Sequence, residues 1–175
     1  MSLPGVVSIR RLVAEDLSDY KALRDEMLAA FPEAFTSDAE SEAARSPTSY
    51  LGRLGIERLD GGHFTLGAWR ATRLLGAIGC EREPRLKVRH IGHIIGMMVR
   101  PEVRGTGLGA ALLEACIAEA RRAQGLELLT LSVSAGNLPA VRLYERAGFV
   151  RYGTLARAIR VGERYLDKDL MSLAL

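Results

Sequence analysis

A short glycine-rich segment joins an apolar stretch to an amphipathic one in the middle of the chain. Residues 99–109 read VRPEVRGTGLG: an apolar run ends at Val99, Arg104 follows, and glycines then occupy every second position up to Gly109. Glycine has no Cβ, so its backbone adopts positive φ angles and its N–H groups approach a bound group closely. A helix that begins after such a loop adds unpaired N–H groups and the positive end of its dipole, which attract phosphate. The segment therefore predicts a strand, a phosphate-binding loop and a helix in succession.

Spacing separates three kinds of phosphate-binding loop. A Walker-type loop requires lysine and then Ser or Thr after its last glycine, where this chain has Ala110 and Ala111. A dinucleotide-binding loop requires glycines at its first, third and sixth positions, and here the third glycine comes one position early. The pattern that fits is Arg-x-x-Gly-x-Gly, formed by Arg104, Gly107 and Gly109. A tight strand-to-helix turn without a ligand is the alternative at this point.

A second motif follows after one predicted helix and one predicted strand. The run LLTLSV at 128–133 has the length of a strand, and Asn137 then has the position of a helix N-cap. The segment NLPAVRLYERAGF that begins there continues with Ala140, Tyr144 and Gly148. The two linked motifs resemble motif A and the Asn-x-x-Ala, Tyr-Glu-x-x-Gly-Phe signature of the GNAT superfamily of N-acetyltransferases.

The order of the predicted elements resembles that superfamily over nearly the whole chain. Strand-like patterns cover residues 6–13, 63–70, 74–83, 88–99, 128–133, 149–157 and 164–173, and helical patterns cover 16–28, a stretch from about 38 that Pro47 interrupts, 110–123 and 137–148. The resemblance implies an α/β (α+β) fold: a mixed, mostly antiparallel central sheet of about seven strands, flanked by about four helices in the order β-α-α-β-β-β-α-β-α-β-β. Because 175 residues suit one domain, we expect a single N-acetyltransferase domain over residues 1–175.

The composition excludes several classes of protein. Hydrophobic residues make up 48% and charged residues 26%, which is typical of a soluble globular domain, and no apolar run has the length of a membrane span. No secretory signal is visible at the N-terminus, and Cys80 and Cys116 are too few for a disulfide framework and lack metal-ligand spacing. The net charge of +3 does not indicate nucleic-acid binding, because aromatic residues are only 6% and do not alternate with basic ones. We expect a cytoplasmic protein with reduced cysteines and no metal.

The resemblance implies acetyl-CoA, a derivative of coenzyme A, as the acetyl donor and a primary amine as the acceptor, carried by a small molecule or a peptide. The amine attacks the thioester directly in a ternary complex. The residues implied to bind the pyrophosphate of the cofactor are Arg104, Gly105, Thr106, Gly107 and Gly109. A polyanionic cofactor also accounts for the basic charge of the chain.

The resemblance also assigns the strand that precedes the glycine loop. It implies that this strand separates from the next one and contacts the pantetheine arm at Met97, Met98 and Val99. A backbone N–H near Met98 then stabilises the oxyanion that forms during attack. Core packing is the alternative role for the two methionines. Asn137 is a further candidate for binding the cofactor or acceptor, with a purely structural helix cap as its alternative.

Three side chains are candidates for proton transfer. Tyr144 matches the position of the family's general acid, which protonates the leaving thiolate. Several family members carry a glutamate as general base six residues before the position of Val99, and here His93 stands there. An unperturbed imidazole suits a general base at neutral pH, although a histidine in an apolar strand often has only a structural hydrogen bond. Glu81, on the preceding predicted strand, is the substitute candidate for the base.

The acceptor is not identified by the sequence. The segments implied to flank the acceptor are 31–38 and 156–163, whose acidic residues Glu33, Asp38 and Glu163 are candidates for binding an ammonium group. The departure at His93 supports a second hypothesis, a non-catalytic acyl-CoA-binding sensor or partner module. An NAD-binding enzyme is a third. Homodimers are common in such folds, and the sequence leaves the oligomeric state open.

Overall fold

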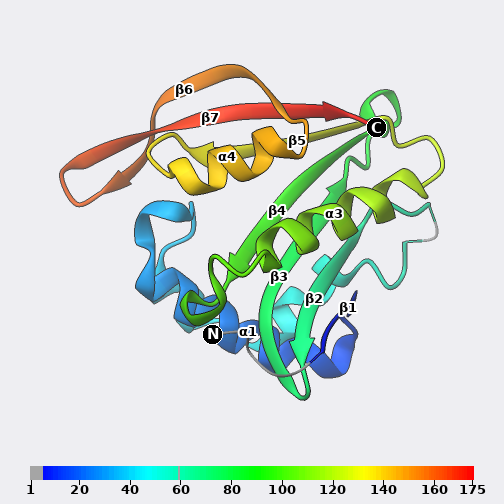
Figure 1. Ribbon diagram of the computed structural model, residues 1–175, viewed down its shortest axis with the longest axis horizontal. Coiled ribbons are helices and arrows are strands. Elements are labelled where there is room, and N and C mark those ends of the chain that lie inside the picture. Colours follow the sequence, from blue (N-terminus) through cyan, green and yellow to red (C-terminus); the bar gives the residue numbers. More distant parts are fainter. Residues whose placement is uncertain (1–5, 59) are drawn as a thin grey trace.

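A computed structural model of the chain describes residues 6–58 and 60–175. Seven strands form a sheet in the order β1-β2-β3-β4-β5-β7-β6 (Figure 1). The strands are β1 (Val7–Arg11), β2 (Phe64–Arg70), β3 (Arg73–Arg82), β4 (Ile91–Val99), β5 (Leu128–Ser134), β6 (Val150–Val161) and β7 (Arg164–Ala174). Neighbouring strands are antiparallel except β4 and β5, which are parallel. The predicted fold class and order of elements are confirmed.

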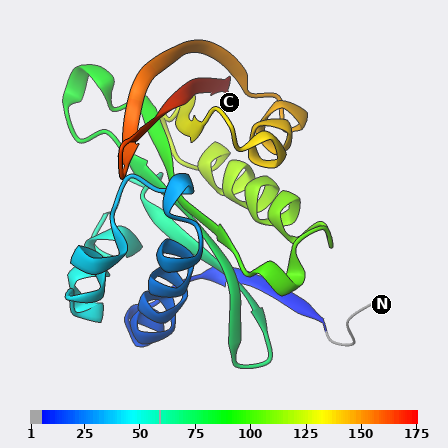
Figure 2. The ribbon, with the colours of Figure 1, turned by 90° about the vertical axis from the view of Figure 1, so that its left-hand side faces the viewer.

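Helices cover both faces of this sheet. The α-helices are α1 (Leu17–Ala30), α2 (Ala39–Ala43), α3 (Leu108–Arg121) and α4 (Leu138–Arg146). The 3-10 segments are η1 (Ala14–Asp16), η2 (Pro32–Ala34), η3 (Pro47–Leu54), η4 (Leu86–Val88) and η5 (Pro101–Val103). Figure 2 shows α1 and the following short helices on one side of the sheet, and α3 and α4 on the other. None of the helices in the described ranges is both long and apolar enough to cross a lipid bilayer.

Two hydrophobic clusters hold these layers together, one on each face. Apolar residues of α3 recur at helical spacing, so Leu112, Leu113 and Cys116 share one side and are fully buried against the sheet. On the opposite face, Tyr20 of α1 and Tyr50 of η3 are buried with Met98 of β4, among others. The strand β4 therefore contributes to both clusters, and its backbone is fixed from two sides.

Two predicted elements differ in the structure. The strand expected from residue 88 begins at Ile91, because the preceding residues Leu86–Val88 form a 3-10 turn. The helical stretch expected from residue 38 is divided into the five-residue α2 and the 3-10 segment η3. The reason is Pro47: a residue before proline avoids the helical region, and Ser46 is extended, with φ −74° and ψ 153°.

Candidate active site

The glycine loop between β4 and α3 is exposed and presents a row of unpaired backbone N–H groups. Gly105 and Gly107 have φ angles of 74° and 88°, and a Cβ added at either would meet no atom within 4 Å. The backbone hydrogen bond that starts α3 runs from the Ala111 N–H to the Gly107 carbonyl, at 3.0 Å. Among the described residues, the backbone N–H groups of 105–110 have no acceptor. The loop therefore offers open space and free donors, as a phosphate group requires.

The side chains of Thr106 and Arg104 form hydrogen bonds that hold the loop in place. The Thr106 hydroxyl donates to the Val103 carbonyl at 2.7 Å, and the Arg104 Nε donates to the Val99 carbonyl at 3.2 Å. The guanidinium carbon of Arg104 lies 3.9 Å from the centroid of the Phe31 ring, at the C-terminal end of α1. This cation–π contact joins the loop to the opposite face of the sheet. Arg104 thus supplies both a positive charge and a fixed position for the loop.

The strands β4 and β5 diverge towards the glycine loop. Their parallel pairing covers only the first residues of each strand and ends at the pair His93 and Thr130. The rest of β4, from Ile94 to Val99, keeps its antiparallel pairing with β3 and has no pairing with β5. The implied separation of the two strands is therefore present, and it leaves one edge of β4 without a hydrogen-bonded neighbour beside the loop.

A bulge in β4 orients the backbone along this free edge. The register with β3 shifts between the pairs Gly79–Ile95 and Ala77–Met98, and Gly96 has a φ angle of 58°. Further along, the Arg100 N–H donates to the Leu75 carbonyl of β3 at 2.9 Å. N–H directions alternate along a strand, so the Met98 N–H also points to β3 and the Val99 N–H points away from it. The donor at the free edge is thus next to Met98 rather than Met98 itself.

Tyr144 of α4 lies in the hydrophobic cluster on the side of α3 and α4, near Cys116. Its side chain is buried and packs edge-on against Phe149, with ring centroids 5.8 Å apart. Burial raises the pKa of Tyr144 well above its usual value, so the phenol stays protonated at neutral pH. Its hydroxyl forms no hydrogen bond within residues 6–58 and 60–175, and it is not among the fully enclosed polar atoms that lack a partner there, so the oxygen reaches the protein surface. The position suits a proton donor whose acceptor belongs to a ligand.

The helix that carries Tyr144 begins at Asn137. The Asn137 side chain accepts a hydrogen bond from the Ala140 N–H at 3.4 Å, and the Asn137 backbone N–H donates to the Ser134 carbonyl at 2.9 Å. The expected N-cap is therefore present. Leu143 of the same helix lies close to the glycine loop, where a Cβ added at Gly109 would be 3.6 Å from it. The cap thus helps to position α4 against the loop.

His93 binds partners with both ring nitrogens. Nδ1 lies 2.6 Å from the Thr130 hydroxyl of β5, and Nε2 lies 3.0 Å from Oε1 of Glu83. The hydrogen bond from His93 lowers the pKa of Glu83, so Glu83 is a carboxylate that accepts a hydrogen bond from the Nε2–H. Nδ1 then accepts the hydrogen bond of the Thr130 hydroxyl. The resulting chain of Glu83, His93 and Thr130 ends where β4 and β5 separate.

Glu81 lies on the strand that precedes β4, as the sequence predicts. It lies directly opposite His93 in the register of β3 and β4, on the same face of the sheet, and no hydrogen bond joins the two side chains. Glu83, two residues later, makes that contact from the diagonal position. The sequence analysis missed Glu83 and Thr130. Side-chain alternation on the predicted hairpin is the signal for Glu83, since it shares a face with Glu81.

These features are matched by a known family. The model of the Acetyltransferase (GNAT) family matches residues 20–149. The chain belongs to the GNAT family. The predicted family is thereby confirmed, and the glycine loop and the motif around Tyr144 both lie within the matched range.

Curated relatives carry acetyltransferase names. An L-methionine sulfoximine/L-methionine sulfone acetyltransferase from Pseudomonas paraeruginosa is 39% identical over 77 residues, which is 44% of each chain. A mycothiol acetyltransferase from Pseudarthrobacter chlorophenolicus is 32% identical over 153 residues, covering 86% of this chain and 45% of that protein. The matches thus span less than half the length of these relatives.

Solved GNAT structures share the fold along the chain. A GNAT acetyltransferase from Streptococcus pneumoniae superimposes with a TM-score of 0.85 at 26% identity, covering 97% of this chain and 100% of that one. A putative acetyltransferase from Salmonella typhimurium, solved with its cofactor acetyl-CoA, gives a TM-score of 0.84 at 21% identity, covering 97% and 94%. The mostly antiparallel sheet also differs from the doubly wound parallel sheet of the common dinucleotide-binding fold.

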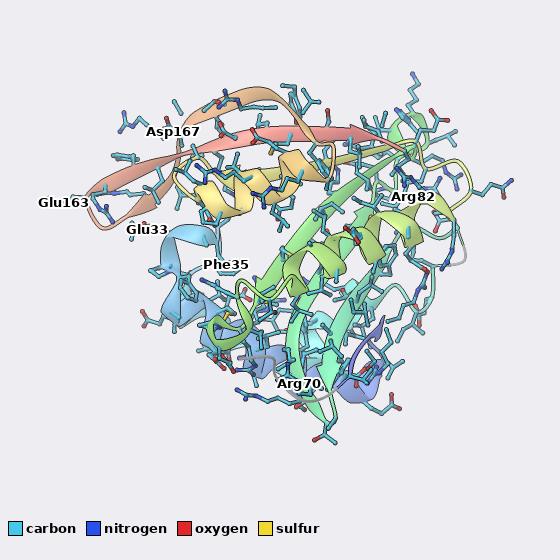
Figure 3. The ribbon with its side chains drawn as sticks, in the orientation of Figure 1. Glu33, Phe35, Arg70, Arg82, Glu163 and Asp167 are labelled. Carbon is cyan, nitrogen blue, oxygen red and sulfur yellow. The ribbon has the colours of Figure 1, made fainter. Side chains whose placement is uncertain are left out.

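The acidic residues considered for the acceptor have other partners or lie at the tip of a hairpin. Figure 3 shows Glu163 at the tip of the β6–β7 hairpin and Glu33 near that tip. The Glu33 carboxylate pairs with Arg164 of β7. Asp38 is the N-cap of α2 and accepts a hydrogen bond from the Ser41 N–H at 2.8 Å, which lowers the pKa of Asp38. Glu33 and Asp38 therefore have structural roles that account for their charges.

A pocket of about 460 Å³ lies away from this site. It is lined by Arg82, Arg89 and Arg122, and Figure 3 places Arg82 at the opposite end of the molecule from Glu33. The guanidinium of Arg82 is buried and donates to the backbone carbonyls of Asp60, Arg89 and Gln124. Its hydrogen bonds join the loops at this end of the sheet. No cluster of three or more metal-ligating side chains occurs among the described residues.

Proposed function

We propose that residues 1–175 form one domain that transfers the acetyl group of acetyl-CoA to a primary amine in a ternary complex. The observation that carries this proposal is the row of unpaired N–H groups at 105–110, at the end of the strand that diverges from β5. We further propose a cytoplasmic location, in keeping with the unpaired, buried Cys80 and Cys116.

The residues present fit the cofactor. The N–H groups of the glycine loop and the positive end of α3 would bind the pyrophosphate, with Arg104 adding its charge. The free edge of β4 at Met97–Val99 would hydrogen-bond the amides of the pantetheine arm, while Met97 and Met98 pack in the two cores. Bound acetyl-CoA supplies the thioester carbonyl that the amine attacks.

Backbone geometry supplies the oxyanion donor. The Val99 N–H points away from β3, on the side where β5 has diverged. A fixed donor in this position stabilises negative charge on the carbonyl oxygen without reorganisation. We therefore assign this role to the Val99 N–H, next to the position that the sequence indicates.

The chain of His93, Thr130 and Glu83 supplies the base. A primary ammonium group with a pKa of about 10.4 must lose a proton before it attacks. In our proposal the Thr130 hydroxyl takes that proton while it passes its own to Nδ1 of His93, and the Glu83 carboxylate stabilises the imidazolium through Nε2. Glu83 thus compensates in part for the absence of a glutamate at position 93.

Tyr144 completes the transfer. The C–N bond forms, the C–S bond breaks, and the sulfur takes up the electron pair of the broken bond. The Tyr144 hydroxyl donates its proton to this sulfur, the attacking nitrogen releases its second proton to solvent as the amide forms, and Tyr144 regains a proton from solvent. A buried phenol with no internal partner is available for such a hydrogen bond, and its raised pKa keeps it in the protonated form.

Two experiments test the proposal. Isothermal titration calorimetry with acetyl-CoA is expected to give saturable binding, and the absence of binding at millimolar concentration would remove the donor assignment. Release of free CoA is then measured with a panel of primary amines, covering small molecules and peptide N-termini. Release of CoA that depends on the added amine supports acetyltransferase activity. Binding of acetyl-CoA without such release supports the second candidate, a non-catalytic acyl-CoA-binding module, which His93 in place of a glutamate favours.

A further inference from the structure

The face of β5 that points away from α3 and α4 carries a row of hydroxyl groups. Alternate residues of this strand point into the core: Leu129, Leu131 and Val133. Thr130, Ser132 and Ser134 therefore point to the other face, towards η2. Each of these hydroxyls contacts a different partner: His93 contacts Thr130, Lys168 contacts Ser132, and the Glu33 carbonyl accepts from Ser134. The base and a lysine thus share one face beside the separation of β4 and β5.

The Lys168 ammonium group has only neutral partners. It donates to the Thr36 hydroxyl at 2.6 Å and to the Ser132 hydroxyl at 3.3 Å. Nowhere in the described ranges does a carboxylate oxygen lie within 4.0 Å of it. Burial lowers the pKa of Lys168, because the charged form is partly desolvated without a counter-charge. An anion bound here would supply the missing counter-charge and stabilise the charged form of Lys168.

The carboxylates nearest in the fold are already paired. Glu33 binds Arg164, as described above. Asp167, which precedes Lys168, accepts a hydrogen bond from the Arg157 N–H at 2.8 Å. Asp169, which follows it, accepts one from the Thr154 hydroxyl at 2.8 Å and lies near Arg151. The uncompensated charge of Lys168 is therefore a local feature of this face.

The spacing along β5 relates the lysine to the base. Side chains two residues apart on a strand are separated by about 7 Å. Thr130 contacts His93 and Ser132 contacts Lys168, so the imidazole and the ammonium group are anchored about one such interval apart. A ligand that hydrogen-bonds at both ends, with each bond about 3 Å long, has its amine and its anionic group a few ångströms apart. Amino acids meet this requirement.

We propose that Lys168 binds a carboxylate of the acceptor, so that the protein acetylates amino acids in preference to simple amines. This inference rests on the proposed function, because it places the acceptor amine at the end of the chain formed by Glu83, His93 and Thr130. Lys168 is then a specificity-determining residue. Its charge pairs with the substrate, while the Ser132 hydroxyl holds the ammonium group on the face that carries Thr130.

A purely structural role makes a different prediction. Lys168 on β7 and Thr36, between η2 and α2, are joined by the hydrogen bond at 2.6 Å, which ties this segment to the sheet. If that tie were the only role of Lys168, Thr36→Val would reproduce the effect of removing the lysine. Removal of the lysine would then also weaken the binding of acceptors with and without a carboxylate equally. Thr36→Val is therefore the matched control, since it keeps the ammonium group and removes the tie.

The experiment measures binding first, so that it does not depend on turnover. L-Methionine sulfone and L-phenylalanine, each with its decarboxylated analogue, are titrated calorimetrically into the protein in saturating coenzyme A. The wild-type protein is expected to bind each acid more tightly than its analogue. Lys168→Met is expected to weaken acid binding about 10- to 100-fold, the range for losing a charged hydrogen-bond partner, and to leave the analogues unchanged. Lys168→Arg retains most of the acid binding.

Turnover with the same pairs separates this inference from the proposed function. Preference for the acids in binding, with no release of CoA, would reject the acetyl transfer and keep the carboxylate site. Release of CoA with equal efficiency for acids and analogues would keep the transfer and overturn the site. Equal weakening of both members of a pair in Lys168→Met, or no binding of either acid at millimolar concentration, would also overturn it.

Discussion

His93 and Tyr144 show how the surroundings of a side chain decide its chemistry. Each residue type is common in a protein core, and neither is chemically unusual by itself. His93 becomes a candidate base because Glu83 and Thr130 bind its two nitrogens. Tyr144 becomes a candidate acid because its hydroxyl has no partner among the described residues while its ring is buried. The two predictions at this scale therefore concern the neighbours of each residue.

Tyr144→Phe is expected to lower kcat about 100-fold and to leave the affinity for acetyl-CoA nearly unchanged. The substitution removes only the proton donor, because the ring and its contact with Phe149 remain. The melting temperature is expected to stay the same or rise, since no internal hydrogen bond is lost. Steady-state kinetics, calorimetry and thermal unfolding of the variant check these three points. Unchanged turnover would reject the role of Tyr144 as the general acid.

His93→Ala is expected to lower kcat at least about 100-fold, and Glu83→Gln about 10-fold, because the glutamine no longer stabilises an imidazolium. Glu81→Gln is the matched control, since Glu81 faces His93 across the strands without a hydrogen bond. Kinetics of the three variants at saturating acetyl-CoA check that kcat falls most in His93→Ala, less in Glu83→Gln and least in Glu81→Gln. A larger loss in Glu81→Gln than in Glu83→Gln would return the assignment to Glu81.

At the scale of elements, the pairing of β4 decides the site. This strand pairs with β5 over its first residues and leaves it after His93, ahead of the bulge at Gly96. The free edge, the glycine loop and the start of α3 then follow each other in the chain. Arg104 and Phe31 connect this unit to the end of α1. The cofactor loop and the acceptor side are therefore physically joined.

Gly107→Ala is expected to weaken acetyl-CoA binding at least 10-fold, on the order of 1.4 kcal/mol. A φ angle of 88° is unfavourable for alanine, so the loop shifts or stays strained by about 1–2 kcal/mol. The new methyl group would also occupy the open space in front of the N–H groups. Gly52→Ala is the control, because a Cβ there meets nothing within 4 Å. Calorimetry with both variants checks the expectation, and equal affinities would count against the loop as the pyrophosphate site.

At the scale of the whole molecule, a buried ionic network holds the α1, α2 and η3 layer together. The Arg24 Nε donates to the Glu42 carboxylate at 2.7 Å, and the Tyr50 hydroxyl donates to the same oxygen. Arg24 also donates to the Ser37 hydroxyl at 3.1 Å, which ties down the segment that carries Thr36. The network therefore stabilises the side of the sheet where we place the acceptor.

The network predicts how stability changes in acid. Burial by itself raises the pKa of Glu42, but the hydrogen bonds from Tyr50 and Arg24 outweigh it and lower the pKa from 4.5 to about 2. Because the folded-state pKa is the lower one, the contribution is complete above about pH 4.5 and is lost as the pH falls towards 2. Glu42→Gln is expected to remove this pH dependence and to cost about 3 kcal/mol at neutral pH, because Arg24 stays buried without its counter-charge. Urea unfolding of both proteins between pH 7 and pH 2 checks both points. Parallel plots of the free energy of unfolding against pH would contradict the first point, and equal free energies at pH 7 would contradict the second.

The sequence by itself determined the features that depend on local backbone rules. Positive φ angles at Gly105 and Gly107, the cap at Asn137 and the alternation of apolar residues were enough to predict the strand, loop and helix of the cofactor site. The same rules predicted the element order, and the resemblance of the two motifs to those of a known superfamily indicated the family. These features involve residues close together in the chain, so spacing and residue type decide them.

Only the tertiary structure decided which distant side chains meet. The sequence analysis chose Glu81 as an alternative to His93, whereas the register of β3 and β4 brings Glu83 to the imidazole. It contained no signal that Lys168 of β7 would face Ser132 of β5 and Thr36 near η2. Such contacts depend on strand register and on the point where β4 leaves β5. A shift of one residue in register would turn each side chain to the other face, which is why local patterns do not reveal them.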